Sequence, residues 1–148
     1  DRIQGLQTEN LAQSRGDLVL RRRDGIISYQ LAVVCDDAAQ GVTEVVRGAD
    51  LLDQTLGQRW LGHCLNFPEM QYAHLPLAMN AQGQKLSKQN LAQPLDASQA
   101  HVLLGLALAA LGQSVPVTND LSTMLDYAVS HWQTGAIPHQ FCLPNTYR

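Results

Sequence analysis

Apolar and polar positions alternate over short distances in the first part of the chain, and this pattern predicts strands. Two apolar runs within residues 17–35 flank Asp24-Gly25, a dipeptide that favours the tight turn of a β-hairpin. The second run, 26–35, is rich in β-branched residues, and its LAVVC segment is continuously apolar. A continuous apolar run is typical of a strand covered on both faces. We therefore predict two strands joined by a turn in this region.

Further along the chain, two short strands flank a helix. The strands are predicted at residues 42–48 and 72–77. Between them, residues 49–66 have helical periodicity, with Leu56, Trp60 and Cys64 at four-residue intervals. Residues four apart lie on the same side of a helix, so these three side chains are expected to share one face.

The last third of the chain has the periodicity of helices. Residues 97–111 predict a strongly apolar helix, and Gly112 follows it as a C-terminal cap. Residues 120–133 predict a second, amphipathic helix with Asp120 or Ser122 near its start. An irregular tail completes the chain.

This order of elements predicts an α/β protein with two parts: residues 1–95 alternate strands and helices, and residues 96–148 form a helical subdomain and tail. The length of 148 residues and the hydrophobic content of 45% suffice for a core. No apolar run reaches the roughly 18 residues of a transmembrane helix. The net charge of −3 argues against a general electrostatic binder of nucleic acid, while leaving room for a local basic patch.

The sulfur and imidazole side chains do not suggest a metal site. Cys35, Cys64 and Cys142 are odd in number and far apart, which argues against a disulfide framework and against zinc bound within this chain. A reducing, cytoplasmic location is expected. None of the five histidines has the paired spacing of metal ligands.

The only two lysines lie three residues apart in the polar segment GQKLSKQN, residues 83–90. Lys85 and Lys88 flank Ser87, and a loop with two ammonium groups and a hydroxyl suits a polyphosphate. A solvated loop is the alternative interpretation.

KLSKQ, residues 85–89, resembles the KMSKS signature of class I aminoacyl-tRNA synthetases. Two further segments resemble the glutamate-specific branch of that family in the same order: YQLAVVCDDAAQGVTEVVRGADLL from residue 29 and HLPLAMNAQGQKLSKQN from residue 74. The resemblance extends from about Asp17 to Leu95. It implies the second half of a Rossmann-like parallel sheet followed by a small helical subdomain, with ligands beyond the carboxyl ends of the strands.

The resemblance also implies roles for single residues. Tyr29 and Arg47 match the positions that contact the glutamate substrate, Arg47 by pairing with a carboxylate. Lys88 matches the lysine that stabilises charge as pyrophosphate leaves, and Lys85 assists it. The implied ATP-binding residues are Lys88, Lys85, Ser87, Leu77 and Ala78.

The residues alone leave other roles open. Tyr29 would serve equally as a packing residue at a strand edge. Arg47 would serve in a surface ion pair with Glu44 or Asp50. The basic run at residues 21–23 would suit either a tRNA backbone or a solvated strand end.

The implied reaction uses ATP and Mg²⁺ to activate glutamate, which is then transferred to an RNA hydroxyl. Val33 stands where glutamyl-tRNA synthetases often carry asparagine, which favours a shorter paralogue that acts on queuosine in tRNA(Asp). A fragment of a glutamyl-tRNA synthetase, a non-catalytic RNA-binding or interaction module, and a generic phosphate-binding domain are the alternatives.

Two features of the family are missing from these 148 residues: an HIGH-like tetrapeptide and the zinc-binding cysteines. Both are expected upstream of Asp1, which makes this chain the C-terminal part of a longer enzyme. We expect the chain alone to be inactive. An open sheet edge would also allow it to dimerise.

Overall fold

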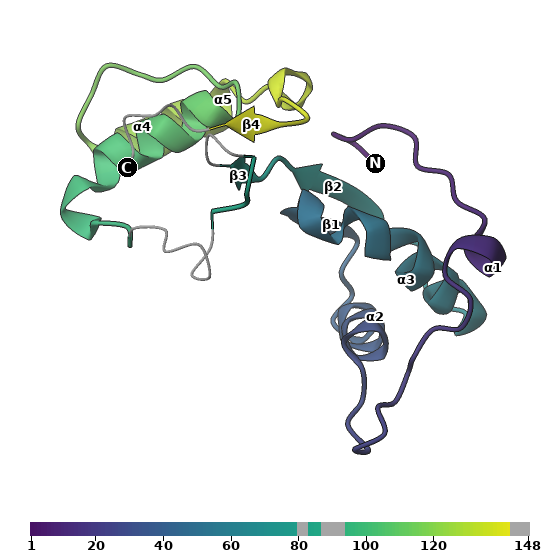
Figure 1. Cartoon of the computed structure of the whole chain (residues 1–148). Helices are drawn as coiled ribbons and strands as arrows, with labels where there is room; N and C mark the ends of the chain where they lie inside the picture. The colour runs from purple at the N-terminus through teal and green to yellow at the C-terminus, as the bar shows by residue number, and fades with distance from the viewer. Residues whose placement is uncertain (80–82, 87–93, 143–148) are drawn as a thin grey trace. The chain divides into compact units, whose positions relative to one another are not determined.

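The computed structural model describes residues 1–79, 83–86 and 94–142. It contains two compact units, Asp1–His74 and Leu75–Arg148, and each is described here by itself (Figure 1). Within the described ranges, no helix is long and apolar enough to cross a bilayer.

The first unit is an α/β arrangement built on a two-stranded sheet. Its strands β1 and β2 pair with each other, and helix α3 connects them, while α2 packs against α3. The elements are α1 (Leu11–Ser14), α2 (Tyr29–Ala39), β1 (Glu44–Gly48), a 3-10 turn (Ala49–Leu51), α3 (Leu52–Cys64) and β2 (Gln71–Leu75). Both short strands and the helix between them are therefore confirmed.

The strand predicted at residues 26–35 is wrong, because most of this run lies in helix α2. Ser28 begins the helix as its N-cap, and its hydroxyl accepts a hydrogen bond from the Leu31 amide at 3.5 Å. The cap satisfies one of the amides that a helix start leaves unpaired. The apolar run then covers α3 in a helical rather than an extended form, so a capped start and tertiary packing override the β-branched residues.

The predicted Asp24-Gly25 turn is present, although no strands extend from it. The Arg22 amide donates to the Ile26 carbonyl at 2.8 Å, and Gly25 takes a φ of +84°. A single antiparallel bridge joins Arg21 to Ile27. The Asp24-Gly25 dipeptide thus predicted the turn correctly, but the strands expected on either side of it are not formed.

Helix α3 turns a different face inward from the one that its large apolar residues suggested. Trp60 and Cys64 are exposed, and the buried residues are Thr55, Gly57, Gln58 and Leu61. The polar members of this buried face bond to a side chain of β1, described below, so hydrogen bonding rather than apolar area decides the orientation.

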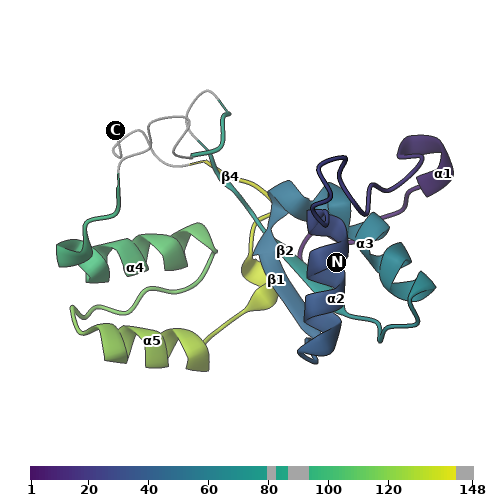
Figure 2. The ribbon, with the colours of Figure 1, turned by 90° about the horizontal axis from the view of Figure 1, so that it is seen from below.

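The second unit pairs two helices and two very short strands. Helices α4 and α5 lie side by side (Figure 2), and Leu108, Met124 and Ala128 are buried. The elements are β3 (Ala78–Met79), a 3-10 turn (Ala97–Gln99), α4 (Ala100–Ala110), α5 (Leu121–Ser130), a 3-10 turn (Thr134–Ala136) and β4 (Phe141–Cys142). Strands β3 and β4 are parallel, with Ala78 opposite Phe141 and Met79 opposite Cys142.

Both helices predicted for this part of the chain are confirmed. Asp120 is the N-cap of α5, and its carboxylate accepts from the Thr123 amide at 2.8 Å. The Thr123 hydroxyl donates to the same carboxylate at 2.6 Å, and this bond, together with the one from the amide, lowers the pKa of the Asp120 carboxyl by favouring its charged form.

Gly112, just past α4, is a position where we predict a large loss of stability on substitution. Its φ is +69°, and a Cβ atom built there would lie 2.1 Å from the Ala136 carbonyl oxygen. Gly112→Ala is therefore expected to lower the free energy of unfolding by roughly 3 kcal/mol, from backbone strain and overpacking together. Urea unfolding measures this loss.

Gly16→Ala is the matched control, because Gly16 has a similar φ of +63° but nothing within 4 Å of the added atom. Its loss is expected to be about 1 kcal/mol, from the strained φ alone. Equal losses in the two variants would contradict the steric part of the prediction.

Candidate functional site

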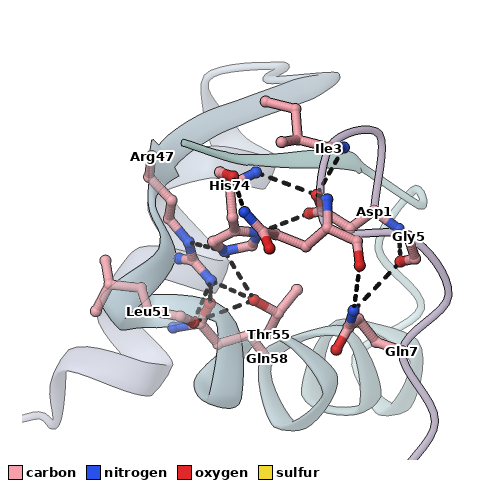
Figure 3. Close-up of polar contacts among 10 residues, drawn as sticks. Asp1, Ile3, Gly5, Gln7, Arg47, Leu51, Thr55, Gln58 and His74 are labelled. Carbon is pink, nitrogen blue, oxygen red and sulfur yellow. Dashed lines mark hydrogen bonds and ion pairs between the residues drawn. The ribbon is translucent and has the colours of Figure 1, made fainter. Parts of the chain in front are cut away.

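Arg47, on β1, is held by hydrogen bonds that it donates to the neighbouring strand and to helix α3 (Figure 3). Its Nε donates to His74 Nε2 at 3.0 Å. Its Nη2 donates to Thr55 Oγ1 at 2.9 Å and to Gln58 Oε1 at 2.8 Å. The residues Arg47, Thr55, Gln58 and His74 are called the arginine cluster below. They fix the guanidinium at a half-buried place, while the predicted partner Glu44 forms an ion pair with Arg2 at 2.9 Å.

His74 is fully buried, and its two ring nitrogens have opposite roles. Guanidinium groups only donate, so His74 Nε2 must accept from Arg47. The proton of the neutral ring is then on Nδ1, which donates to Asp1 Oδ2 at 2.6 Å. A second proton on Nε2 would face the Arg47 N–H.

Burial, and then the positive charge of Arg47, lower the pKa of His74 from 6.5 to about 4. This shift predicts that the protein loses stability on acidification. Between those two pH values the unfolded chain binds the His74 proton and the folded chain does not, so unfolding is favoured as the pH falls. The contribution is complete above about pH 6.5 and amounts to about 3 kcal/mol.

Urea unfolding at several pH values between about 7 and 4 measures this slope. His74→Gln removes the titrating group, so the variant is expected to have a shallower slope. A slope equal to that of the wild type would show that other groups cause the pH dependence.

Tyr29 lies at the start of α2, where its side chain is 52% exposed, and a short relay of glutamines connects that helix to Arg47. Gln58, which accepts from Arg47, donates to Gln30 Oε1 at 2.9 Å. Gln30 is the neighbour of Tyr29 and donates in turn to Gln54 Oε1 at 2.9 Å. The relay thus links Arg47 to helix α2, the helix that begins at Tyr29.

Tyr72 contacts Arg47 and also lines a cavity. The Arg47 guanidinium carbon is 5.3 Å from the centre of the Tyr72 ring, and burial raises the pKa of the Tyr72 hydroxyl. The residues that line this cavity of about 440 Å³ include Tyr72, Gln58 and Val33 of α2. Its volume is in the range of small-molecule sites.

The predicted ATP-binding residues belong to the second unit. The Leu86 amide donates to the Ala78 carbonyl at 2.8 Å, and an antiparallel bridge joins Met79 to Lys85, whose side chain is exposed. Leu77 directly precedes β3. Ser87 and Lys88 lie outside the described residues. The convergence of the lysines with Tyr29 and Arg47 stays a prediction, as do the roles of all these residues.

Sequence reasoning missed three members of the arginine cluster. Thr55 and Gln58 are polar residues three apart on a helix, which places both on one face. His74 is a single histidine in a predicted strand. These signals become informative only when the half-buried Arg47 supplies a shared partner. In the part of the chain that the structure describes, no three His, Cys, Asp or Glu side chains form a group able to hold a metal ion.

Comparison with known proteins connects this geometry to a sequence family. Residues 3–107 match the family described as tRNA synthetases class I (E and Q), catalytic domain. The chain is 58% identical over 147 residues to glutamyl-Q tRNA(Asp) synthetase of Acinetobacter baylyi, a match that covers 99% of this chain and 50% of that protein. It is 50% identical over 143 residues to the protein of the same name from Dechloromonas aromatica, covering 95% of this chain and 48% of that protein.

The chain therefore spans about half the length of the curated relatives it matches. Among solved structures, glutamate-tRNA synthetase from Elizabethkingia anophelis has a TM-score of 0.63 at 21% identity. That match covers 87% of this chain and 30% of the other. At this identity the likeness is one of fold.

Proposed function

This chain belongs to the class I tRNA synthetase family for glutamate and glutamine, and on that premise we propose that it is part of a ligase for queuosine in tRNA(Asp). The ligase would use ATP to activate glutamate and would transfer it to the cyclopentene-diol of queuosine in the anticodon. The observation that carries the proposal is the anchored Arg47 in a chain 58% identical to a glutamyl-Q tRNA(Asp) synthetase. A cytoplasmic location follows from this role.

Arg47 supplies a fixed positive charge for a glutamate carboxylate, and its attachment to two elements limits the motion of that charge. Tyr29 adds one directional hydrogen bond from an exposed position at the start of α2. Val33 gives the adjacent cavity an apolar surface, at the position where glutamyl-tRNA synthetases often carry a polar asparagine. Together these residues would orient the amino acid.

In the first step, a glutamate carboxylate oxygen attacks the α-phosphorus of ATP, and the bond to the bridging oxygen breaks as pyrophosphate leaves. Lys88 and Lys85 would stabilise the negative charge that develops on the departing phosphates, and Mg²⁺ would neutralise the phosphates when bound. In the second step, a queuosine hydroxyl attacks the glutamyl carbonyl carbon, AMP leaves, and the hydroxyl proton passes to solvent.

The fold has a matching interpretation. We propose that β1, α3 and β2 are the second half of a Rossmann-like sheet, and that α4 and α5 form its helical subdomain. Dimerisation of the isolated chain through an open sheet edge is a further part of the proposal.

The decisive experiment uses the intact protein that carries this sequence. Glutamate-dependent exchange of pyrophosphate into ATP is expected, followed by attachment of labelled glutamate to queuosine-containing tRNA(Asp). Unmodified tRNA(Asp) and tRNA(Glu) are the controls and are expected to accept none. Charging of tRNA(Glu) would instead identify a glutamyl-tRNA synthetase, and RNA binding without exchange would favour a non-catalytic module.

The purified 148-residue chain is expected to show no pyrophosphate exchange, because much of the ATP site is assigned to the remaining half of the protein. The same assay measures this. Detectable exchange by the chain alone would contradict the assignment of much of the ATP site to the remaining half of the protein.

A further inference from the structure

We propose that His74 is a positioning residue for glutamate binding: it holds the Arg47 guanidinium in the one orientation that presents Nη1 to the substrate carboxylate. This inference rests on the proposed function, because it assumes that Arg47 binds glutamate. It adds a residue to the site that neither the family signature nor the chain's exposed polar residues indicated.

The contacts show how His74 acts on Arg47. The histidine is on β2, next to β1, and accepts from Nε, the nitrogen nearest the arginine stem. Thr55 and Gln58 of α3 take the two hydrogens of Nη2. With Nε bonded to the strand and Nη2 to the helix, rotation about the last side-chain torsions of Arg47 would break at least one bond. The guanidinium is therefore preorganised before glutamate arrives.

The ring of His74 is itself held in one state. Asp1 accepts from Nδ1 at 2.6 Å, and the side chains of both residues are buried. Asp1 Oδ1 also accepts from the His74 amide at 3.2 Å, so the carboxylate holds the strand and the ring together. Arg47, the ammonium group of Asp1 and Asp50 are the other charged groups that act on the ring, and Tyr72 lies parallel to it with a centroid distance of 6.1 Å. The result is a neutral ring with a permanent acceptor at Nε2.

A purely structural role is the competing explanation, since a buried histidine with two partners also stabilises a fold. The two roles differ in what a substitution changes. Loss of a structural residue lowers the amount of folded protein and affects all substrates alike. Loss of a positioning residue raises the KM for glutamate and leaves the KM for ATP unchanged.

Substitution of His74 by glutamine or by asparagine distinguishes its two ring contacts, because the two amide side chains differ in length. Glutamine places its amide near Nε2 and retains an acceptor for Arg47, whereas asparagine places its amide near Nδ1 and retains only the bond to Asp1. In pyrophosphate exchange by the intact protein, His74→Asn is expected to raise the KM for glutamate about 20-fold, the effect of one lost charge-assisted hydrogen bond. His74→Gln is expected to stay within about threefold of the wild type.

A double-mutant comparison with Arg47→Lys tests whether His74 acts through the arginine. A lysine side chain has no N–H group at the position of Arg47 Nε, so the bond to His74 is already lost in an Arg47→Lys protein. His74→Asn should therefore add less than about twofold to the KM of that protein. A full additional effect would mean that His74 acts independently of Arg47 and would overturn the proposal. The same holds for an unchanged KM in His74→Asn, for equal KM changes for glutamate and ATP, or for equal losses in the asparagine and glutamine variants.

The ¹⁵N NMR spectrum of the wild-type imidazole gives a test that needs no variant to fold. A neutral ring protonated at Nδ1 is expected, and a ring protonated at Nε2 would overturn the proposal. Absence of glutamate-dependent exchange in the wild type would overturn the proposed function, and the inference with it. Normal exchange with an unchanged KM in His74→Asn would overturn the inference alone.

Discussion

Replacing Arg47 with alanine is expected to raise the KM for glutamate by about two to three orders of magnitude and to leave the KM for ATP within about threefold. Truncation leaves the substrate carboxylate without its charged partner in a partly buried site. It also leaves Gln58 Oε1 without the Arg47 donor, and it removes one of the two contacts of His74 Nε2, which keeps Thr55 Oγ1 at 3.1 Å. The first effect acts on glutamate alone, and the second acts on the fold.

The two effects can be separated. The hydrogen bonds lost from the arginine cluster are expected to lower the free energy of unfolding by about 1–3 kcal/mol, which urea unfolding measures. Kinetics at a temperature where the variant is fully folded then report the loss of glutamate binding. Steady-state pyrophosphate exchange over a range of glutamate concentrations provides the KM.

Arg22→Ala is the matched control. Arg22 forms an exposed ion pair with Asp24 at 2.8 Å, and it has no part in the arginine cluster or in the lining of the cavity. Surface pairs of this kind contribute little, so the KM for glutamate is expected to change less than about twofold. A comparable rise in the two variants would mean that the loss of positive charge in general, rather than Arg47, weakens binding.

Replacing Lys88 with alanine is expected to lower the kcat of pyrophosphate exchange by about two to three orders of magnitude, with a smaller change in the KM for ATP. The proposed role of this lysine is to stabilise charge that appears only as pyrophosphate leaves. An interaction made mainly in the transition state affects kcat more than binding. Rapid-quench measurement of adenylate formation on the intact protein gives the rate of this step directly.

Lys85→Ala is the natural comparison, because it removes the same charge three positions earlier. The bridge between Met79 and Lys85 is formed by the backbone, so truncating the side chain leaves it in place. We expect a loss of about tenfold, in keeping with an assisting role. A larger loss for Lys85 than for Lys88 would reverse the assignment of the two residues.

The elements of the fold that depend on local pattern were predictable. The helix at α5 begins at Asp120 because an aspartate caps it, and α4 is followed by Gly112 because glycine accepts the left-handed conformation. Strand β1 was predictable from VTEVVRG. Helix α2 was not, because its β-branched core is compatible with either structure and only the cap at Ser28 and the packing on α3 decide between them.

The candidate site was predictable to a different extent. Tyr29, Arg47 and the lysines were proposed because they match motifs, and their roles stay predictions. The partners of Arg47 could not be predicted, since they come from two segments that no sequence spacing relates: Thr55 and Gln58 on a helix and His74 on the next strand. Asp1, which bonds to His74, comes from a third segment. Such a buried polar group depends on tertiary structure, and each member has an ordinary alternative role when considered alone.

The parallel pairing of β3 with β4 also constrains the order of events during synthesis. Ala78 pairs with Phe141, so β3 can form its sheet only after a residue 63 positions later has been synthesised. At ribosomal rates of roughly 5–20 residues per second, that delay lasts several seconds. Throughout it, one side of β3 has unpaired amides and carbonyls that a neighbouring nascent chain can reach. A nascent chain that ends before residue 141 would keep this edge of β3 unpaired.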